Sequence, residues 1–164
     1  MTVVIVTGTP ATGKTTLAKH IAKDFGFRRI DVGPLIKSKH LSEGYDKRRL
    51  CEIVDTDKLV SELTRLIVKS GGRKLVIDSH LSHYLPADYV DICLVTKCDL
   101  KELKRRLERR YDVNKVRENL DAEIFDICYN EAKEFGHNVQ VVDTTRGINI
   151  QELKKLLKSF LIRD

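Results

Sequence analysis

Residues 8–15 have the composition and spacing of a phosphate-binding loop. They read GTPATGKT and match G-x-x-x-x-G-K-[ST] at every fixed position, between a β-branched run and a helical pattern. The glycines let the backbone bend around an anion, and successive amide N–H groups at the start of the helix point at it. The predicted ATP contacts in this loop are Gly8, Ala11, Thr12, Gly13, Lys14, Thr15 and Thr16.

Four polar side chains have the chemistry of a magnesium-dependent phosphoryl-transfer site. Lys14 supplies a full charge to the β- and γ-phosphates, and the Thr15 hydroxyl can ligate Mg²⁺. Asp78 closes a short aliphatic run, where a neighbouring strand would present a carboxylate to the metal, partly through water. His80 follows it and can orient a water or Asp78, although a turn aspartate and a solvent-facing histidine are the plainer alternatives. A metal pair of His80 with His83 is disfavoured, because no third ligand follows at a suitable spacing.

An arginine-rich segment at 104–112, KRRLERRYD, is typical of a lid that closes over phosphates. Planar guanidinium groups stabilise a moving phosphoryl group better than lysine does, and a lid also excludes water. Arg105 and Arg109 share one helical face, and Arg106 and Arg110 share the next. We expect one or two of Arg105, Arg109 and Arg110 to reach the phosphates. The alternative is a solvated helix with internal ion pairs, which accounts for some of these charges.

Strand-like and helix-like patterns alternate along the chain. A short β-branched run predicts a strand at 3–7, and further strands are expected at 28–31, 74–78, 91–95 and 138–143. Apolar residues at helical spacing predict helices around 17–25, 59–67, 100–107, 116–132 and 150–160. This order predicts an α/β fold: a three-layer P-loop NTPase sandwich with a five-stranded, mostly parallel sheet covered by helices on both faces. We expect one domain over residues 1–164.

Composition limits the class of protein further. The formal charge is +6, which favours anionic partners such as nucleotides or nucleic acid without choosing between them. The longest aliphatic runs are only about four residues, far short of the roughly 18 that a membrane span needs, and the start does not resemble a signal peptide. Four scattered cysteines without a C-x-x-C pair predict reduced thiols in a cytoplasmic protein.

A small GTPase is a weaker interpretation of the same loop. Residues 96–99, TKCD, resemble the guanine-reading [NT]-K-x-D tetrad. Only one strand fits between Asp78 and this tetrad, whereas a GTPase needs two strands and a helix. The segment 78–81, DSHL, also lacks the glycine of the D-x-x-G switch, and Asp99 suits a helix cap. The guanine interpretation is therefore disfavoured.

The whole chain resembles the atypical adenylate kinases known as the isoenzyme six family, in particular its archaeal-type members. The matching segments run in the family's order: the loop at 8–16, DVG at 31–33, GYD at 44–46, DTD at 55–57, VIDSH at 76–80, RY at 110–111, EN at 118–119 and EIF at 123–125. The resemblance implies a fold similar to nucleoside monophosphate kinases, an acceptor-nucleotide region at about 31–54 and a lid at about 108–118. It also implies binding to a platform protein of the small ribosomal subunit during late maturation of the pre-ribosome.

The chain departs from the family pattern at four places. Ala11 replaces a loop glycine, which is tolerable only if its φ is negative. Lys37 stands where an arginine usually clamps the acceptor phosphate, and Leu81 replaces a glycine after His80. The lid reads RRY without the usual glycine, so the equivalent of the lid arginine is ambiguous.

These observations predict reversible phosphoryl transfer from MgATP to AMP or a similar nucleoside monophosphate by a monomer. Catalysis would come from positioning and charge stabilisation, with no covalent protein intermediate. The catalytic candidates are Lys14, Asp78, His80, Arg109 and Arg110; Arg105 joins the ATP contacts; Asp31, Gly33, Lys37 and Tyr45 are the acceptor candidates. The alternative function is an assembly ATPase whose nucleotide state gates docking on a ribosomal protein.

Overall fold

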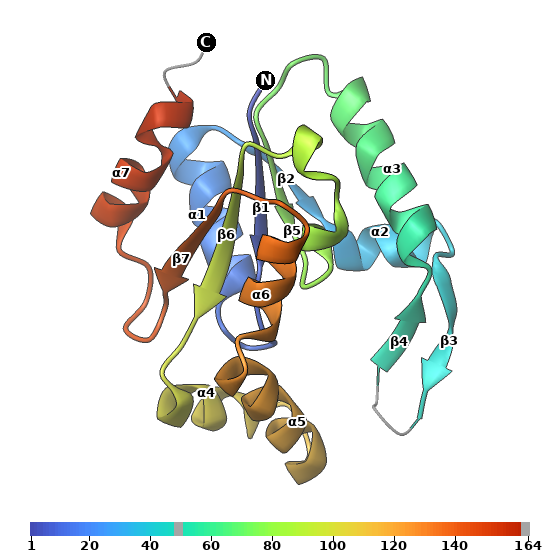
Figure 1. Ribbon diagram of the computed structural model, residues 1–164, viewed down its shortest axis with the longest axis vertical. Helices are drawn as coiled ribbons and strands as arrows, with labels where there is room; N and C mark the ends of the chain where they lie inside the picture. Colours follow the sequence, from blue (N-terminus) through green and yellow to red (C-terminus); the bar gives the residue numbers. More distant parts are fainter. Residues whose placement is uncertain (48–50, 162–164) are drawn as a thin grey trace.

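The computed structural model describes residues 1–47 and 51–161 and contains one five-stranded parallel sheet (Figure 1). Its strand order is β2-β5-β1-β6-β7, so that the first strand lies in the middle. The strands are β1 Val3–Thr7, β2 Arg28–Asp31, β5 Leu75–Asp78, β6 Ile92–Lys97 and β7 Val139–Asp143. All four pairings are parallel, which confirms the fold class expected from the alternating patterns.

Helices cover both faces of this sheet (Figure 1). On one face, α1 (Lys14–Phe25) and α7 (Ile150–Leu161) pack on Val4 and Val6 of β1. On the other, α2 (Val32–Ser38), α3 (Thr56–Lys69) and α6 (Ile127–Glu134) pack on Val3 and Ile5, together with Leu85, which follows the 3₁₀ turn Ser82–Tyr84. A second 3₁₀ turn, Ala87–Tyr89, precedes β6. Because successive side chains of a strand point to opposite faces, β1 is apolar from Val3 to Val6 and buried on both sides.

Two arms extend past the carboxyl ends of the strands (Figure 1). One arm consists of α4 (Leu100–Leu107) and α5 (Val113–Ile124), which pack together through Leu103, Leu107 and Val116. The other is an antiparallel hairpin of β3 (Ser42–Asp46) and β4 (Cys51–Val54). The phosphate-binding loop lies at the same end of the sheet, so both arms flank it. No helix among the described residues is long and apolar enough to cross a membrane.

The structure corrects two expectations about the elements. The hairpin was not predicted, because β3 is exposed along most of its length and therefore lacks an alternating apolar pattern. The helix predicted around 116–132 is two helices, since α5 ends at Ile124, Phe125 caps it and Asp126 adopts a left-handed φ of 53°. An ion pair with Lys97 holds Asp126 in place, and apolar residues continue at helical spacing across the break.

Candidate active site

The loop between β1 and α1 depends on two glycines. Gly8 has a φ of 143° and Gly13 a φ of 91°, both in the region that residues with a side chain rarely adopt. A Cβ at Gly8 would lie 2.4 Å from Thr96 Oγ1 and 2.7 Å from the Thr96 carbonyl oxygen. The sharp turn over β6 therefore has no room for a side chain at this position.

Ala11 does not have the negative φ that its place in the loop was expected to require. Its φ is 66°, in the left-handed region, so the expectation of a negative φ is wrong. An L-residue in this conformation costs roughly 1–2 kcal/mol. The methyl group packs against the apolar cluster between α4 and α5, which offsets part of that cost.

The Lys14 ammonium lies inside the loop. Its Nζ donates hydrogen bonds of 2.9 Å to the carbonyl oxygens of both Gly8 and Thr9. Burial lowers the pKa of Lys14 from 10.5 to about 8, although nearby Asp78 and Glu123 favour the charged form. The amine is thus a desolvated cation whose charge a bound phosphate would stabilise.

This lowered pKa predicts proton uptake when nucleotide binds. Above pH 8 a growing share of the free protein has a neutral Lys14, and the phosphates of ADP raise the pKa of the amine again, so binding takes up a proton. We expect uptake of about half a proton or more at pH 8.5, and almost none from Lys14 at pH 6.5. Titration calorimetry of ADP in buffers of different ionisation enthalpy measures it. Uptake of the same size in Lys14→Arg, which stays charged, would contradict the assignment.

Hydrogen bonds to Thr96, Thr144 and Glu123 anchor the loop. The buried Thr12 hydroxyl lies 2.7 Å from both the Thr9 carbonyl oxygen and Thr96 Oγ1, and Thr144 Oγ1 donates to the Thr12 carbonyl at 2.5 Å. From α5, Glu123 accepts 2.7 Å and 3.2 Å bonds from the Thr9 hydroxyl and the Cys98 amide. The Thr12 side chain therefore faces the protein, while its backbone remains part of the loop.

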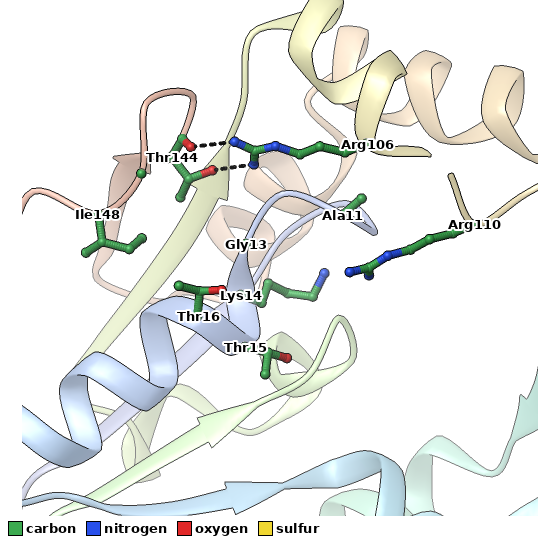
Figure 2. Close-up of a pocket in the computed structure, with 10 residues that line it drawn as sticks. Ala11, Gly13, Lys14, Thr15, Thr16, Arg106, Arg110, Thr144 and Ile148 are labelled. Atoms are coloured by element: carbon green, nitrogen blue, oxygen red, sulfur yellow. Dashed lines mark hydrogen bonds between the residues drawn. The ribbon is translucent and has the colours of Figure 1, made fainter. Parts of the chain in front are cut away.

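A cavity of about 370 Å³ opens above the loop. Its walls are Ala11, Gly13, Lys14, Thr15, Thr16, Arg106, Arg110, Thr144, Gly147 and Ile148. Figure 2 shows the Arg110 guanidinium turned toward the Lys14 ammonium, so two cations from different elements converge on one space. Such an arrangement favours a ligand with several negative charges.

The structure distinguishes among the lid arginines. Arg105 is exposed, donates to Glu102 at 2.7 Å and 2.8 Å, and takes no part in the cavity wall; Arg109 is also exposed and outside that wall. Arg106 forms part of the wall instead, and donates 2.8 Å and 3.2 Å bonds to the carbonyl oxygens of Thr144 and Thr145. Its spacing of four residues from Arg110 was the signal in the sequence that could have identified it.

Alanine substitution of the two neighbouring arginines should separate their roles. Arg106→Ala removes both a cavity wall and the link between α4 and the loop after β7, so we expect ADP affinity to fall about tenfold. Arg105→Ala removes only an exposed ion pair and should change affinity less than twofold. Titration calorimetry gives both dissociation constants, with thermal unfolding as the check on folding. Equal losses in the two variants would be evidence against this cavity as the nucleotide site.

The Asp78 carboxylate lies beside the loop, on the α1 face of the sheet. It is buried and is close enough to favour the charged form of Lys14. Arg29, which sequence reasoning missed, donates to Asp78 Oδ2 from Nε at 3.2 Å and from Nη2 at 2.6 Å. A hydroxyl at Thr15 and a carboxylate at Asp78 are oxygen ligands of the kind Mg²⁺ takes, so these residues suit a nucleotide-bound magnesium ion.

His80 and His83 have different surroundings in the structure. His80 is exposed at the surface, and desolvation of its ring, followed by the charges of Lys14 and Lys115, lowers its pKa to about 4. His83 is buried with Nδ1 2.9 Å from the Thr7 hydroxyl. The described residues contain no cluster of three or more His, Cys, Asp or Glu side chains able to hold a metal.

The acceptor candidates are spread over β2, α2 and the hairpin. Asp31 caps α2 by accepting a 3.2 Å bond from the Gly33 amide, and its other oxygen pairs with Arg29 at 2.7 Å. Lys37 is exposed on α2, and Tyr45 is 55% exposed on β3. None of these residues lines the cavity above the phosphate-binding loop.

The loop after the first strand of the parallel sheet bends at glycines and carries a lysine, and a guanidinium from a separate arm lies across the cavity from it. These features define the class of P-loop phosphotransferases. Residues 4–126 match a family model described as AAA domain. The adenylate kinase isoenzyme 6 homolog of Dictyostelium discoideum is 38% identical over 131 residues, covering 79% of this chain and 73% of that protein. The Schizosaccharomyces pombe homolog is 37% identical over 155 residues, covering 94% and 86%. The chain belongs to the adenylate kinase isoenzyme 6 family.

Solved structures show the same fold at low identity. A sugar kinase from Janibacter superposes with a TM-score of 0.63 at 18% identity, covering 99% of this chain and 96% of that one. The YorR protein of Bacillus subtilis, in complex with phosphorylated GDP, gives 0.59 at 15% identity, covering 98% and 95%. These matches confirm the predicted kinase-like sandwich.

Proposed function

We propose that this protein transfers the γ-phosphoryl group of ATP to AMP or a similar nucleoside monophosphate. The observation that carries the proposal is the half-buried Lys14 ammonium, which faces the Arg110 guanidinium across the cavity above the loop. Two converging cations and a ring of amide groups are suited to a polyphosphate tail, whose charge must be held and redistributed during transfer. Family membership supports a nucleotide acceptor.

The residues of the chain would act by positioning and by charge. Lys14 and the loop amides hold the β- and γ-phosphates, while Arg110 stabilises the charge on the transferred group. An oxygen of the acceptor phosphate attacks the γ-phosphorus as the bond to the bridging oxygen breaks and ADP leaves. Thr15 and Asp78 would hold Mg²⁺, which would supply neutralisation of the phosphate charge. No protein group is phosphorylated.

The acceptor site is proposed to lie in the region of about 31–54, with the lid at about 108–118. Asp31, Gly33, Lys37 and Tyr45 are its candidate contacts, and part of this region, residues 48–50, lies outside the described structure. The hairpin and the α4–α5 arm flank the strand ends, which suits two substrates that meet over the loop (Figure 1). Arg109 and Arg105, both outside the cavity wall, would contribute only if the lid moved.

The test is a coupled assay of ADP formation with AMP, CMP, dAMP and no acceptor. We expect AMP to raise the rate at least tenfold over ATP alone and to be preferred to CMP. A rate that no nucleoside monophosphate raises would refute the kinase proposal. Competition by GTP as strong as that by ATP would revive the GTPase interpretation.

A second candidate function is an assembly ATPase in small-subunit maturation. The neutral His80, whose ring makes no hydrogen bond with any described residue, is free to orient a water toward the γ-phosphate. The proposed partners are a small-subunit platform protein and the pre-ribosome, and the +6 charge is compatible with both. Sedimentation with purified pre-ribosomal particles, with and without ATP, tests this; binding indifferent to nucleotide, with no acceptor-free hydrolysis, would refute it.

We also propose a monomer in the cytoplasm. The thiols of Cys93, Cys98 and Cys128 are free, and burial raises the pKa of Cys93 to about 12, which makes that thiol unreactive. Reduced thiols are usual in a reducing compartment.

A further inference from the structure

Arg29 makes a contact with the magnesium-site carboxylate that the proposed reaction does not explain. In β2, Arg29 and Asp31 point to the same face of the sheet, because side chains two residues apart share a face. The parallel pairing of β2 with β5 places Asp31 opposite Asp78. Arg29 therefore lies between two carboxylates, 2.6 Å from Asp78 Oδ2 and 2.7 Å from Asp31 Oδ2.

The two carboxylate oxygens of Asp78 differ in their hydrogen bonding. Arg29 Nε and Nη2 both donate to Oδ2, while Oδ1 receives no hydrogen bond from any residue that the structure describes. The Asp78 side chain is only 4% exposed, so this contact takes place largely out of water. A guanidinium in this arrangement orients the carboxylate with Oδ1 free, and it also cancels part of the negative charge that a divalent ion would feel.

We propose that Arg29 is a positioning residue that sets how strongly Mg²⁺ and nucleotide bind together at this site. The proposal rests on the proposed function, because it needs a magnesium nucleotide between Thr15 and Asp78. Arg29 holds Asp78 in one orientation and weakens its attraction for the metal. The chain thus couples Mg²⁺ to nucleotide less tightly than it would with a neutral residue at position 29.

The test measures ADP binding by titration calorimetry, in EDTA and across a Mg²⁺ series, for wild type and Arg29→Gln. The ratio of the two dissociation constants is the magnesium coupling. We expect Arg29→Gln to raise this ratio about tenfold, because the carboxylate that would face the metal is no longer partly neutralised by a guanidinium in contact with it. Its ADP affinity in EDTA should stay within about threefold of wild type.

Three further variants make the result specific. Arg29→Lys keeps the charge and should stay within threefold of the wild-type coupling. Arg28→Gln removes an exposed arginine from the same strand, on the opposite face, and should change nothing. In an Asp78→Asn background, Arg29→Gln should raise the coupling by clearly less than tenfold, because only the direct repulsion between the guanidinium and the metal remains and the part that passes through Asp78 is lost.

Loss of Arg29 leaves a buried carboxylate without its partner, so folding must be checked by thermal unfolding. If Arg29→Gln does not fold, Arg29→Met replaces it as the single variant. The magnesium coupling of Asp78→Asn can then still be compared with that of the double variant Arg29→Gln/Asp78→Asn. Binding of Mn²⁺ to the ADP complex, followed by electron paramagnetic resonance, gives a second readout free of turnover.

Two results would overturn the inference. An unchanged or lower coupling in Arg29→Gln would show that Arg29 does not weaken the metal site. A raised KM for AMP with unchanged magnesium coupling would assign Arg29 to the acceptor phosphate instead. Failure of the proposed function is distinguishable, because it appears in the wild-type protein as a rate of ADP formation that no nucleoside monophosphate raises, whatever the magnesium coupling of the Arg29 variants.

Discussion

Lys14→Ala is expected to lower ADP formation from ATP and AMP by about a thousandfold or more. Its Nζ lies inside the loop, 2.9 Å from the carbonyl oxygens of Gly8 and Thr9, where no other cation on the same element can replace it. Removal of one preorganised charge or donor from a transition state typically costs factors of 10² to 10³, and here the charge also binds the ground-state phosphates. The coupled assay at saturating Mg²⁺ measures the loss.

The fold should survive this change. Burial already disfavours the Lys14 ammonium, as its lowered pKa of about 8 shows, so its removal relieves a desolvation cost. We therefore expect the free energy of unfolding to be unchanged or slightly raised. Lys19→Ala, an exposed lysine of the same helix, is the matched control and should keep full activity. Near-normal ADP formation by Lys14→Ala would refute the assignment of this loop as the reacting centre.

Gly8→Ala is expected to destabilise the protein by about 3 kcal/mol or more and to abolish nucleotide binding. The added Cβ would lie 2.4 Å from Thr96 Oγ1 and 2.7 Å from the Thr96 carbonyl oxygen, so β6 or the loop must move. The φ of 143° adds backbone strain of roughly 1–3 kcal/mol for a residue with a side chain. Urea denaturation measures the change in stability, and calorimetry measures ADP binding.

The Gly26→Ala variant is a control that introduces backbone strain without a steric clash. Gly26 ends α1 with a φ of 74°, and no atom lies within 4 Å of the position of its Cβ. This variant should therefore cost only the left-handed backbone term of roughly 1–2 kcal/mol, with ADP binding intact. If both glycine variants lose the same stability and keep ADP binding, close packing of the loop against β6 is not what shapes the site.

Much of the fold could be predicted because its signals are local. The five strands of the sheet lie within two residues of their predicted ends, and three of them, β1, β5 and β6, are short, mainly apolar runs buried along nearly their whole length. The exposed hairpin, which includes Tyr45, carries no such run and was missed. The helix predicted around 116–132 failed for a different reason: apolar spacing continues across Asp126, and only the ion pair with Lys97 and the left-handed backbone show the break.

The sequence by itself determined the phosphate-binding loop, because that chemistry is contained in eight consecutive residues that turn, donate and carry charge together. Only the tertiary structure decided which arginines serve the site. Arg106 lines the cavity and Arg105 does not, because their side chains leave α4 in different directions. Arg29 meets Asp78 although 49 positions separate them, because two parallel strands place side chains that are distant in the chain on one face of the sheet. Contacts of that kind depend on register and facing, which no local pattern encodes.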